Sequence, residues 1–125
     1  MLSIILNGCF GRMGEELQKE IYNREDLNLV AGIDRTKQDA AFPVYQSLAE
    51  VNETADVVID FSHESSIPHL VDQCVQKQLP VVIATTGLSE QKKQKLQEAS
   101  RAIPLFYSAN MSLGINVLIE ALQKL

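Results

Sequence analysis

Short apolar runs alternate with longer amphipathic segments along this chain. Five runs are apolar without regular alternation, which is typical of strands buried on both faces of a sheet. They are Leu2–Leu6, Leu27–Ile33, Val57–Ile59, Pro80–Ala84 and Ile103–Tyr107. The polar stretch 35–41 is predicted to be a loop.

Apolar residues spaced three and four apart predict helices between these strands. Met13, Leu17 and Ile21 predict a helix over 12–22, and a second helix has one apolar face at Ile67, Leu70, Val71, Cys74 and Val75. Ser65 or Ser66 is expected to cap the second helix, and Pro68 fits only its first turn. A polar helix from the cap Ser89 to Ser100 follows. Ser47 and Glu50 have the spacing of a capping box on a short helix.

Strands that alternate with helices predict a parallel sheet, because parallel strands need crossover connections. Right-handed crossovers place helices on both faces of such a sheet. The expected fold is therefore a doubly wound, Rossmann-like α/β domain over residues 1–114. The last segment, 115–125, predicts a helix that is apolar nearly all round, so we expect it to pack on something sizeable. Its ending has neither a glycine cap nor a proline, and we expect the chain to lead from there toward an absent substrate domain.

Composition narrows the function classes. The 125 residues are 46% apolar and 22% charged, as in globular proteins, without a bilayer-length apolar run or a signal peptide, so we expect a cytoplasmic protein that does not bind membranes. The net charge is −5 and the Lys and Arg residues are scattered, which argues against nucleic-acid binding. The two cysteines indicate neither a metal site nor a disulfide.

Three glycines follow the first strand at intervals of three, Gly8, Gly11 and Gly14. A glycine turn that opens a helix can hold a diphosphate, because the first N–H groups of the helix are unpaired and glycine permits close approach. The spacing differs from the common G-x-G-x-x-G fingerprint, so a purely structural turn remains an alternative. Cys9, within the turn, is interpreted either as a reactive thiol near a helix N-terminus or as a small residue that a tight turn tolerates.

Asp34 ends the second strand, 20 residues beyond Gly14, where an acidic side chain binds the adenosine ribose in dinucleotide-binding domains. The alternatives for a lone Asp at a strand end are a helix cap or a solvated charge. Arg35 follows directly, and its guanidinium is suited to a 2′-phosphate, although a surface arginine in a polar loop fits equally well. Polar clusters at the ends of three later strands, 60–62, 84–87 and 108–111, indicate a shared crevice at the carboxyl edge of the sheet.

The segments NGCFGRMG, DFS, ATTG and SANMSLGINV, in this order and spacing, resemble the N-terminal domain of the dihydrodipicolinate reductase family. The resemblance covers nearly the whole chain. It implies an NAD(P)H-dependent reductase of bacterial lysine (diaminopimelate) biosynthesis, which reduces a cyclic imine dicarboxylate to tetrahydrodipicolinate. NADH and NADPH are both implied as cofactors.

The resemblance also implies the site residues. The turn formed by Gly8, Cys9, Phe10, Gly11, Arg12 and Met13 would hold the diphosphate, Asp34 the adenosine ribose, and Arg35 the 2′-phosphate of NADPH. Phe61 would be an apolar neighbour of the cofactor. Two loops would face the nicotinamide: Ala84, Thr85 and Thr86, and Ser108, Ala109, Asn110 and Met111.

Two departures from the family pattern stand out. Ala84 replaces a glycine that the family usually has; its methyl group leaves the backbone contacts possible, so we expect binding to survive with a less close approach to the nicotinamide. The family's substrate domain carries adjacent histidines followed by a lysine, whereas His63 and His69 are the only histidines here and are not adjacent. We therefore expect loop or helix-surface roles for both, with no catalytic residue and no metal ligand in this chain.

The sequence thus predicts a domain that binds cofactor without turnover. A regulatory domain that senses NAD(H) and catalyses nothing fits the fold equally well, and a domain that binds a methyl donor or CoA is a further alternative. The apolar segment 115–125 leads to the hypothesis of a homo-oligomer, since a helix without its neighbour leaves an exposed apolar face.

Overall fold

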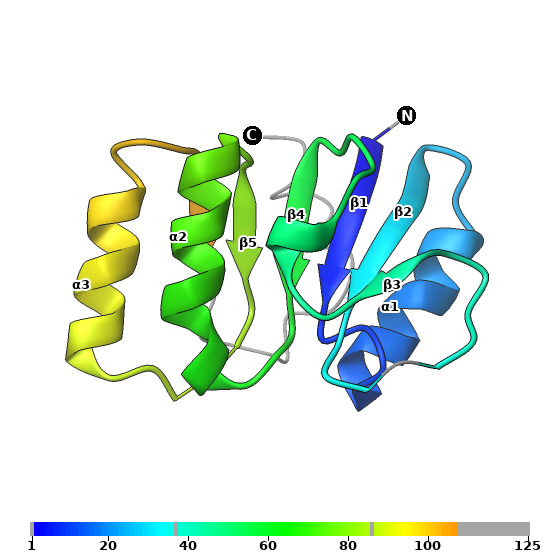
Figure 1. Ribbon diagram of the computed structural model, residues 1–125, viewed down its shortest axis with the longest axis horizontal. Helices are drawn as coiled ribbons and strands as arrows, with labels where there is room; N and C mark the ends of the chain where they lie inside the picture. The colour runs from blue at the N-terminus through cyan, green and yellow to red at the C-terminus, as the bar shows by residue number, and fades with distance from the viewer. Residues whose placement is uncertain (1, 37, 86, 108–125) are drawn as a thin grey trace.

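The computed structural model describes residues 2–36, 38–85 and 87–107. They form a six-stranded, wholly parallel sheet with the strand order β3-β2-β1-β4-β5-β6 (Figure 1). The strands are β1 (Leu2–Asn7), β2 (Leu27–Ile33), β3 (Val44–Tyr45), β4 (Val57–Asp60), β5 (Val81–Ile83) and β6 (Leu105–Tyr107). The order changes direction between β1 and β4, which is where ligands bind in open α/β sheets.

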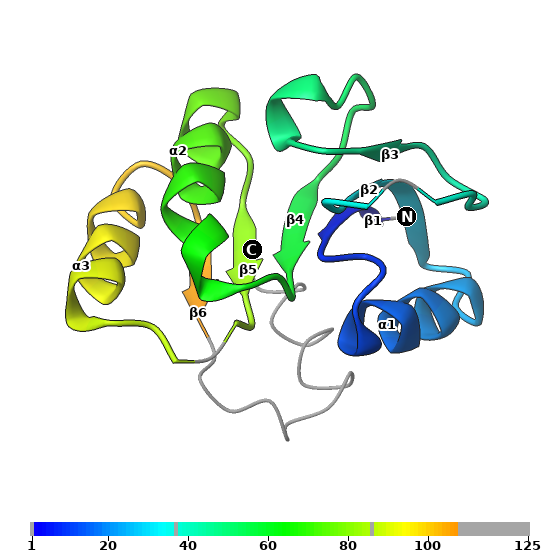
Figure 2. The ribbon, with the colours of Figure 1, turned by 60° about the horizontal axis from the view of Figure 1, so that its bottom comes forward.

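Helices cover both faces of the sheet, as the doubly wound fold requires. The helices are α1 (Arg12–Tyr22), α2 (Ile67–Lys77) and α3 (Glu90–Ala99), with short 3₁₀ helices η1 (Leu48–Glu50) and η2 (Glu64–Ser66). Neighbouring residues of β1 point to opposite faces: Ile4 packs with Leu17 and Ile21 of α1, whereas Ile5 packs with residues of α2 and α3. Figure 2 shows α1 beside β1 and β2, and α2 and α3 side by side near β4 and β5.

The five predicted strands and three predicted helices are present, with ends that differ by one or two residues. Strand β3 was not predicted. It has two residues at the sheet edge, and it is held by backbone bonds from the N–H of Gly32 to Pro43 O (2.9 Å) and from the N–H of Asp34 to Tyr45 O (3.0 Å).

Two predicted caps are wrong. Ser47 precedes a 3₁₀ helix, η1, and its side chain makes no capping hydrogen bond, so the capping box is not formed. Ser66 occupies the N-cap position of α2 without capping it by its side chain, because η2 precedes α2 and His63 caps η2 instead. Ser89 does cap α3, since its hydroxyl accepts from the N–H of Lys92 (3.3 Å).

The helix predicted over 115–125 lies outside the described residues. Within the described part of the chain, no helix combines the length and apolar character needed to cross a membrane.

Candidate functional site

The glycine turn is folded tightly onto the end of β4. Gly8 adopts φ +79°, a conformation that L side chains rarely adopt, and a Cβ atom there would lie 2.7 Å from the carbonyl O of Phe61. A Cβ atom on Gly14 would lie 2.2 Å from the carbonyl O of Gly8. Both glycines are therefore required by the fold: one lets the turn approach β4, and the other lets α1 pack on the turn.

Gly11 is different, because the fold does not require a glycine there. Its φ is −72°, which any residue adopts, and the nearest atom to an added Cβ is Gly8 O at 3.5 Å, an ordinary contact distance. Gly11 is exposed and is the N-cap residue of α1. A side chain at this position would instead occupy space in front of the helix N-terminus.

The N-terminus of α1 presents backbone donors that no other described residue accepts. Gly11 offers no side chain to cap the helix, and the N–H groups of Arg12, Met13 and Gly14 have no acceptor within the described residues. The N–H groups on either side are paired, since Gly11 donates to Gly8 O (3.2 Å) and Glu15 donates to Gly11 O (2.9 Å). Three donors without a described acceptor, at the positive end of the helix dipole, are suited to bind an anion.

Asp34 lies against this turn. Its Oδ2 accepts a hydrogen bond from the N–H of Phe10 (3.0 Å), and its Oδ1 accepts one from the N–H of Thr36 (3.3 Å). The carboxylate is half-buried and keeps further lone pairs for an added ligand. Arg35, the next residue, is exposed. The structure thus brings Asp34 and the glycine turn together, as the spacing predicts.

The side chain of Cys9 is buried beneath the turn, in the apolar cluster that also contains Phe42. Burial, reinforced by the negative charge of Asp34, raises the pKa of the Cys9 thiol to about 12. The thiol therefore stays protonated near neutral pH, which favours a packing role over a reactive one. The backbone carbonyl O of Cys9 accepts a hydrogen bond from Gln18 Nε2 (2.6 Å).

A buried carboxylate joins the ends of three strands. Asp60, the last residue of β4, is fully buried. Its Oδ1 accepts from Asn7 Nδ2 (2.8 Å) at the end of β1 and from both the N–H (3.2 Å) and the hydroxyl of Ser62. Its Oδ2 accepts from the hydroxyl of Thr85, just after β5. The partners that the described residues supply are all neutral donors.

Burial raises the pKa of Asp60, against the opposing effect of the hydrogen bonds from Ser62, Thr85 and Asn7. Asp60 and Ser62 were not among the predicted site residues, although Phe61 between them was. The missed signal is an Asp that directly follows three apolar residues of a fully buried strand, Val57–Ile59.

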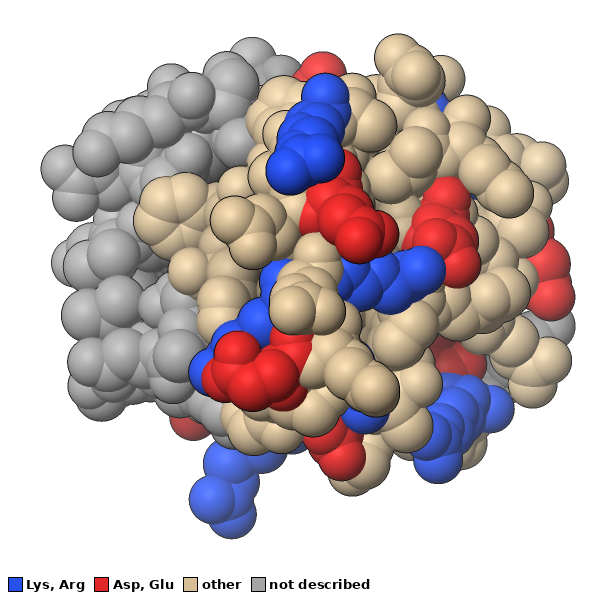
Figure 3. Space-filling model, turned by 90° about the vertical axis from the view of Figure 1, so that its left-hand side faces the viewer, with Lys and Arg blue, Asp and Glu red and all other residues tan. Residues whose placement is uncertain are grey.

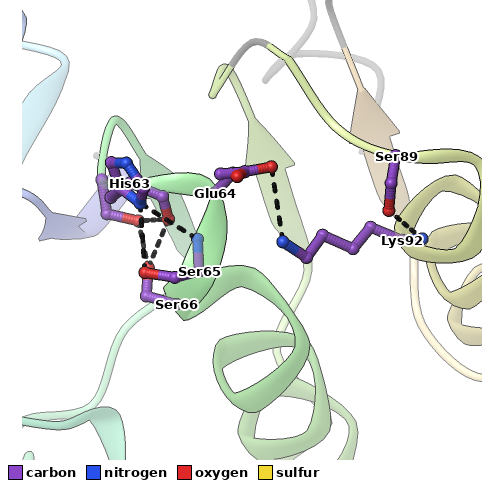
Figure 4. Close-up of polar contacts among 7 residues, drawn as sticks. His63, Glu64, Ser65, Ser66, Ser89 and Lys92 are labelled. Atoms are coloured by element: carbon purple, nitrogen blue, oxygen red, sulfur yellow. Dashed lines mark hydrogen bonds and ion pairs between the residues drawn. The ribbon is translucent and has the colours of Figure 1, made fainter.

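The turn after β4 continues into a polar network around η2 (Figure 4). His63 Nδ1 accepts from the N–H of Ser65 (3.2 Å), and the hydroxyl of Ser66 donates to His63 O (2.9 Å). Glu64 pairs with Lys92 of α3 (3.4 Å), which ties this turn to the start of α3. These contacts give His63 a structural role in the loop.

The second histidine lies on the surface of α2. His69 is exposed, and its Nε2 lies 3.1 Å from Nε2 of Gln73, one helical turn away. Within the described residues, no group of three or more His, Cys, Asp or Glu side chains is arranged to hold a metal ion.

Charges of both signs alternate over the face that α2 and α3 form (Figure 3). Lys95 of α3 pairs with Asp72 of α2 (2.9 Å), and Lys93 pairs with Glu90 within α3 (3.6 Å). A surface of this kind is typical of a solvated face.

The predicted nicotinamide-facing residues are described only in part. Phe61 is half-buried, and Ala84 and Thr85 are buried at the end of β5, where the N–H of Ala84 donates to Asp60 O (3.0 Å). Thr86, Ser108, Ala109, Asn110 and Met111 lie outside the described residues.

Comparisons with known proteins identify the family that the chain resembles. Residues 2–111 match the family model described as "Dihydrodipicolinate reductase, N-terminus". Relatives named 4-hydroxy-tetrahydrodipicolinate reductase include one from Caldanaerobacter subterraneus subsp. tengcongensis, 49% identical over 99% of this chain and 49% of the relative. Another, from Clostridium novyi, is 40% identical over 98% of this chain and 49% of the relative.

Among solved structures, the dipicolinate-bound dihydrodipicolinate reductase from Paenisporosarcina sp. TG-14 superposes with a TM-score of 0.77. It is 24% identical, and the match covers 88% of this chain and 48% of that one, so it supports the fold alone. The chain spans about half the length of the curated relatives that it matches.

Proposed function

The chain belongs to the dihydrodipicolinate reductase N-terminal family, and we propose that it binds a reduced pyridine dinucleotide, NADH or NADPH, at the carboxyl edge of its sheet. In this proposal it is the cofactor-binding half of a 4-hydroxy-tetrahydrodipicolinate reductase. That enzyme reduces a cyclic imine dicarboxylate to tetrahydrodipicolinate in lysine biosynthesis.

The observation that carries the proposal is the opening of α1. The N–H groups of Arg12, Met13 and Gly14 have no acceptor within the described residues, and Gly11 lacks a side chain where the fold would accept one. Both features are explained by a diphosphate that lies in front of the helix, hydrogen-bonded to the free donors and close to the Cα of Gly11. A purely structural turn explains Gly8 and Gly14 but leaves Gly11 without a reason.

Asp34 supports a ribose site next to the diphosphate. It lies at the end of β2, and it already contacts the N–H of Phe10 in the glycine turn. A carboxylate in this position accepts hydrogen bonds from the adenosine ribose hydroxyls. Arg35, exposed beside it, is suited to pair with the 2′-phosphate of NADPH, so we propose that NADPH binds as well as NADH.

The nicotinamide half would then extend across the end of β4 toward the end of β5, past Phe61, Ala84 and Thr85, with Thr86 and residues 108–111 completing the site. When bound, the reduced nicotinamide supplies the hydride for the imine carbon. The residues of this chain hold and orient that ring and keep water from it.

We expect the 125 residues to bind the dinucleotide without measurable turnover. Their only two histidines are His63, which caps η2, and His69, which is exposed on α2. Neither belongs to an adjacent His-His pair followed by a lysine, the groups that would supply the proton and hold the substrate carboxylates.

Calorimetric titration with NADH and NADPH tests the proposal. Saturable binding of one molecule per chain is expected, together with no oxidation of the dinucleotide when the cyclic imine substrate is added. Absence of binding by both dinucleotides contradicts the proposed cofactor site, and rapid substrate-dependent oxidation contradicts the expected lack of turnover. S-adenosylmethionine and coenzyme A serve as competitors, because displacement of NADH by either one would favour a different ligand class.

A further inference from the structure

The buried carboxylate of Asp60 links the elements that surround the proposed cofactor. Its hydrogen-bond partners come from the end of β1 (Asn7), from the turn after β4 (Ser62) and from the segment after β5 (Thr85). The first of these strands leads into the glycine turn, and the last leads into the loop that would face the nicotinamide. Asp60 is thus bonded to segments on both sides of the point where the sheet order reverses.

The backbone around Asp60 is fixed by the same contacts. The N–H of Phe61 donates to Asn7 O (2.9 Å), and the N–H of Ala84 donates to Asp60 O (3.0 Å). The carbonyl of Phe61 is the atom that a Cβ on Gly8 would meet at 2.7 Å. A shift of the Phe61–Ser62 peptide would therefore displace the glycine turn on one side and the loop after β5 on the other.

A charge in this position is unfavourable for a purely structural role. Asp60 is fully buried and has no cationic partner among the described residues, and ionised carboxylates are costly to bury unless several donors compensate them. Both of its oxygens accept hydrogen bonds, so a single carboxylate holds donors from three segments at once. An apolar residue would fill the same space without that penalty, but it would leave the side-chain donors of Asn7, Ser62 and Thr85 without this shared acceptor.

We propose that Asp60 is a positioning residue that sets the geometry of the nicotinamide half of the site, through the Phe61–Ser62 turn and Thr85. The adenosine half depends instead on Asp34 and on the opening of α1. This inference rests on the proposed function, since it assigns a role within the same cofactor site.

The test compares NADH with ADP-ribose, which has the same adenosine diphosphate half but no nicotinamide. Asp60→Ala is expected to weaken NADH binding about tenfold, because it removes a charged hydrogen-bond acceptor, while ADP-ribose binding stays within about twofold of the wild type. We expect NADH fluorescence to rise on binding to the wild type and this rise to be lost in Asp60→Ala, since that signal reports on the surroundings of the nicotinamide.

Asp60→Asn provides the conservative rescue. Its Oδ1 accepts from Asn7 and Ser62, and its Nδ2 donates to the Thr85 hydroxyl, which then donates to Ser62 O at the existing 3.0 Å. This variant is expected to restore most of the NADH affinity. The matched control is Asp56→Ala, at the opposite end of β4, where an exposed carboxylate accepts from the N–H of Ser3 (2.7 Å). Its ratio of NADH to ADP-ribose affinity should equal that of the wild type.

Thr85→Val and Thr85→Ser keep the proposal testable if Asp60→Ala does not fold. The valine replaces the hydroxyl that reaches Asp60 and Ser62 O with a methyl group and should weaken NADH binding selectively, whereas the serine keeps the hydroxyl and should not. Equal weakening of NADH and ADP-ribose, or no selective effect in the valine variant, overturns the inference while the proposed function stands. Failure of the wild-type chain to bind either ligand overturns both.

Discussion

The backbone N–H of Phe10 donates a hydrogen bond to Asp34 Oδ2 across 3.0 Å. This bond joins the turn after β1 to the end of β2, two points separated by 24 residues in the sequence. It places a carboxylate next to the free donors at the start of α1. The positions proposed to hold the diphosphate and the ribose are therefore fixed to each other by the protein itself.

Asp34→Asn separates the two roles of this carboxylate. The amide oxygen still accepts from Phe10, so the free energy of unfolding should change by about 1 kcal/mol or less. An amide accepts fewer hydrogen bonds from the ribose hydroxyls, so NADH and ADP-ribose should both bind about tenfold more weakly. Urea unfolding and calorimetry measure the two quantities. Asp39→Asn, an exposed carboxylate in the same loop, is the control, and equal affinities in the two variants would contradict a ribose role for Asp34.

The sequence predicted this relationship because it follows from local order. A buried strand, a glycine turn and a helix, followed by a second strand that ends in an acidic residue, place that residue beside the turn in a parallel sheet. Gly14 was predictable for the same reason, since the helix that opens such a turn packs closely on it. The contact of Gly8 with Phe61 was not predictable, because it depends on β1 lying next to β4.

The Asp60 network could not be predicted in this way. Asn7 and Asp60 end β1 and β4, and Thr85 follows β5. Their contacts depend on the order β1-β4-β5, which the sequence pattern does not specify. The cap by His63 was missed because a serine was expected to cap α2 directly. In the structure η2 precedes α2, and an imidazole nitrogen of His63 caps η2. Strand β3 was missed because two residues are too few to show a periodic pattern.

Gly11→Ala should mainly weaken NADH binding, whereas Gly14→Ala should mainly lower the stability of the fold. The first places its Cβ at an ordinary contact distance, so stability should change by about 1 kcal/mol or less, while NADH binding falls about tenfold or more because the methyl group occupies the diphosphate space. The second puts a Cβ 2.2 Å from a backbone oxygen, and should lower the free energy of unfolding by about 2 kcal/mol. Tight NADH binding by Gly11→Ala would show that the diphosphate does not lie against this residue.

Arg35→Ala tests the discrimination between the two dinucleotides. The guanidinium is exposed and can pair with a 2′-phosphate, a group that NADH lacks. NADPH affinity should therefore fall about tenfold while NADH affinity changes by about twofold or less. Arg101→Ala, an exposed arginine after α3, should change neither affinity. Parallel losses for NADH and NADPH in Arg35→Ala would assign this side chain a role other than 2′-phosphate recognition.

The buried Asp60 also predicts how stability depends on pH. Burial raises its pKa in the folded protein above the ordinary value of 3.8. Its contribution to stability is therefore fully present below pH 3.8 and is lost as the pH rises through the folded-state pKa. Relative to Asp60→Asn, the wild type should become progressively less stable as the pH rises above 3.8, until Asp60 is ionised in the folded state as well.

Urea unfolding of both proteins across this pH range measures the difference directly. Because Asn does not titrate, it removes the contribution of Asp60 and leaves the other carboxyl groups unchanged. A difference in unfolding free energy that stays constant, or that grows in favour of the wild type as the pH rises, would contradict a raised pKa for Asp60.

The most direct test of the cofactor site is a ¹⁵N–¹H NMR titration of the chain with NADH. A diphosphate bound at the start of α1 should shift the amide signals of Arg12, Met13 and Gly14 most strongly, because these three N–H groups have no acceptor within the described residues. Asp34 and its neighbours should respond next, through the ribose. Saturable shifts concentrated elsewhere, with these three amides unmoved, would contradict the account.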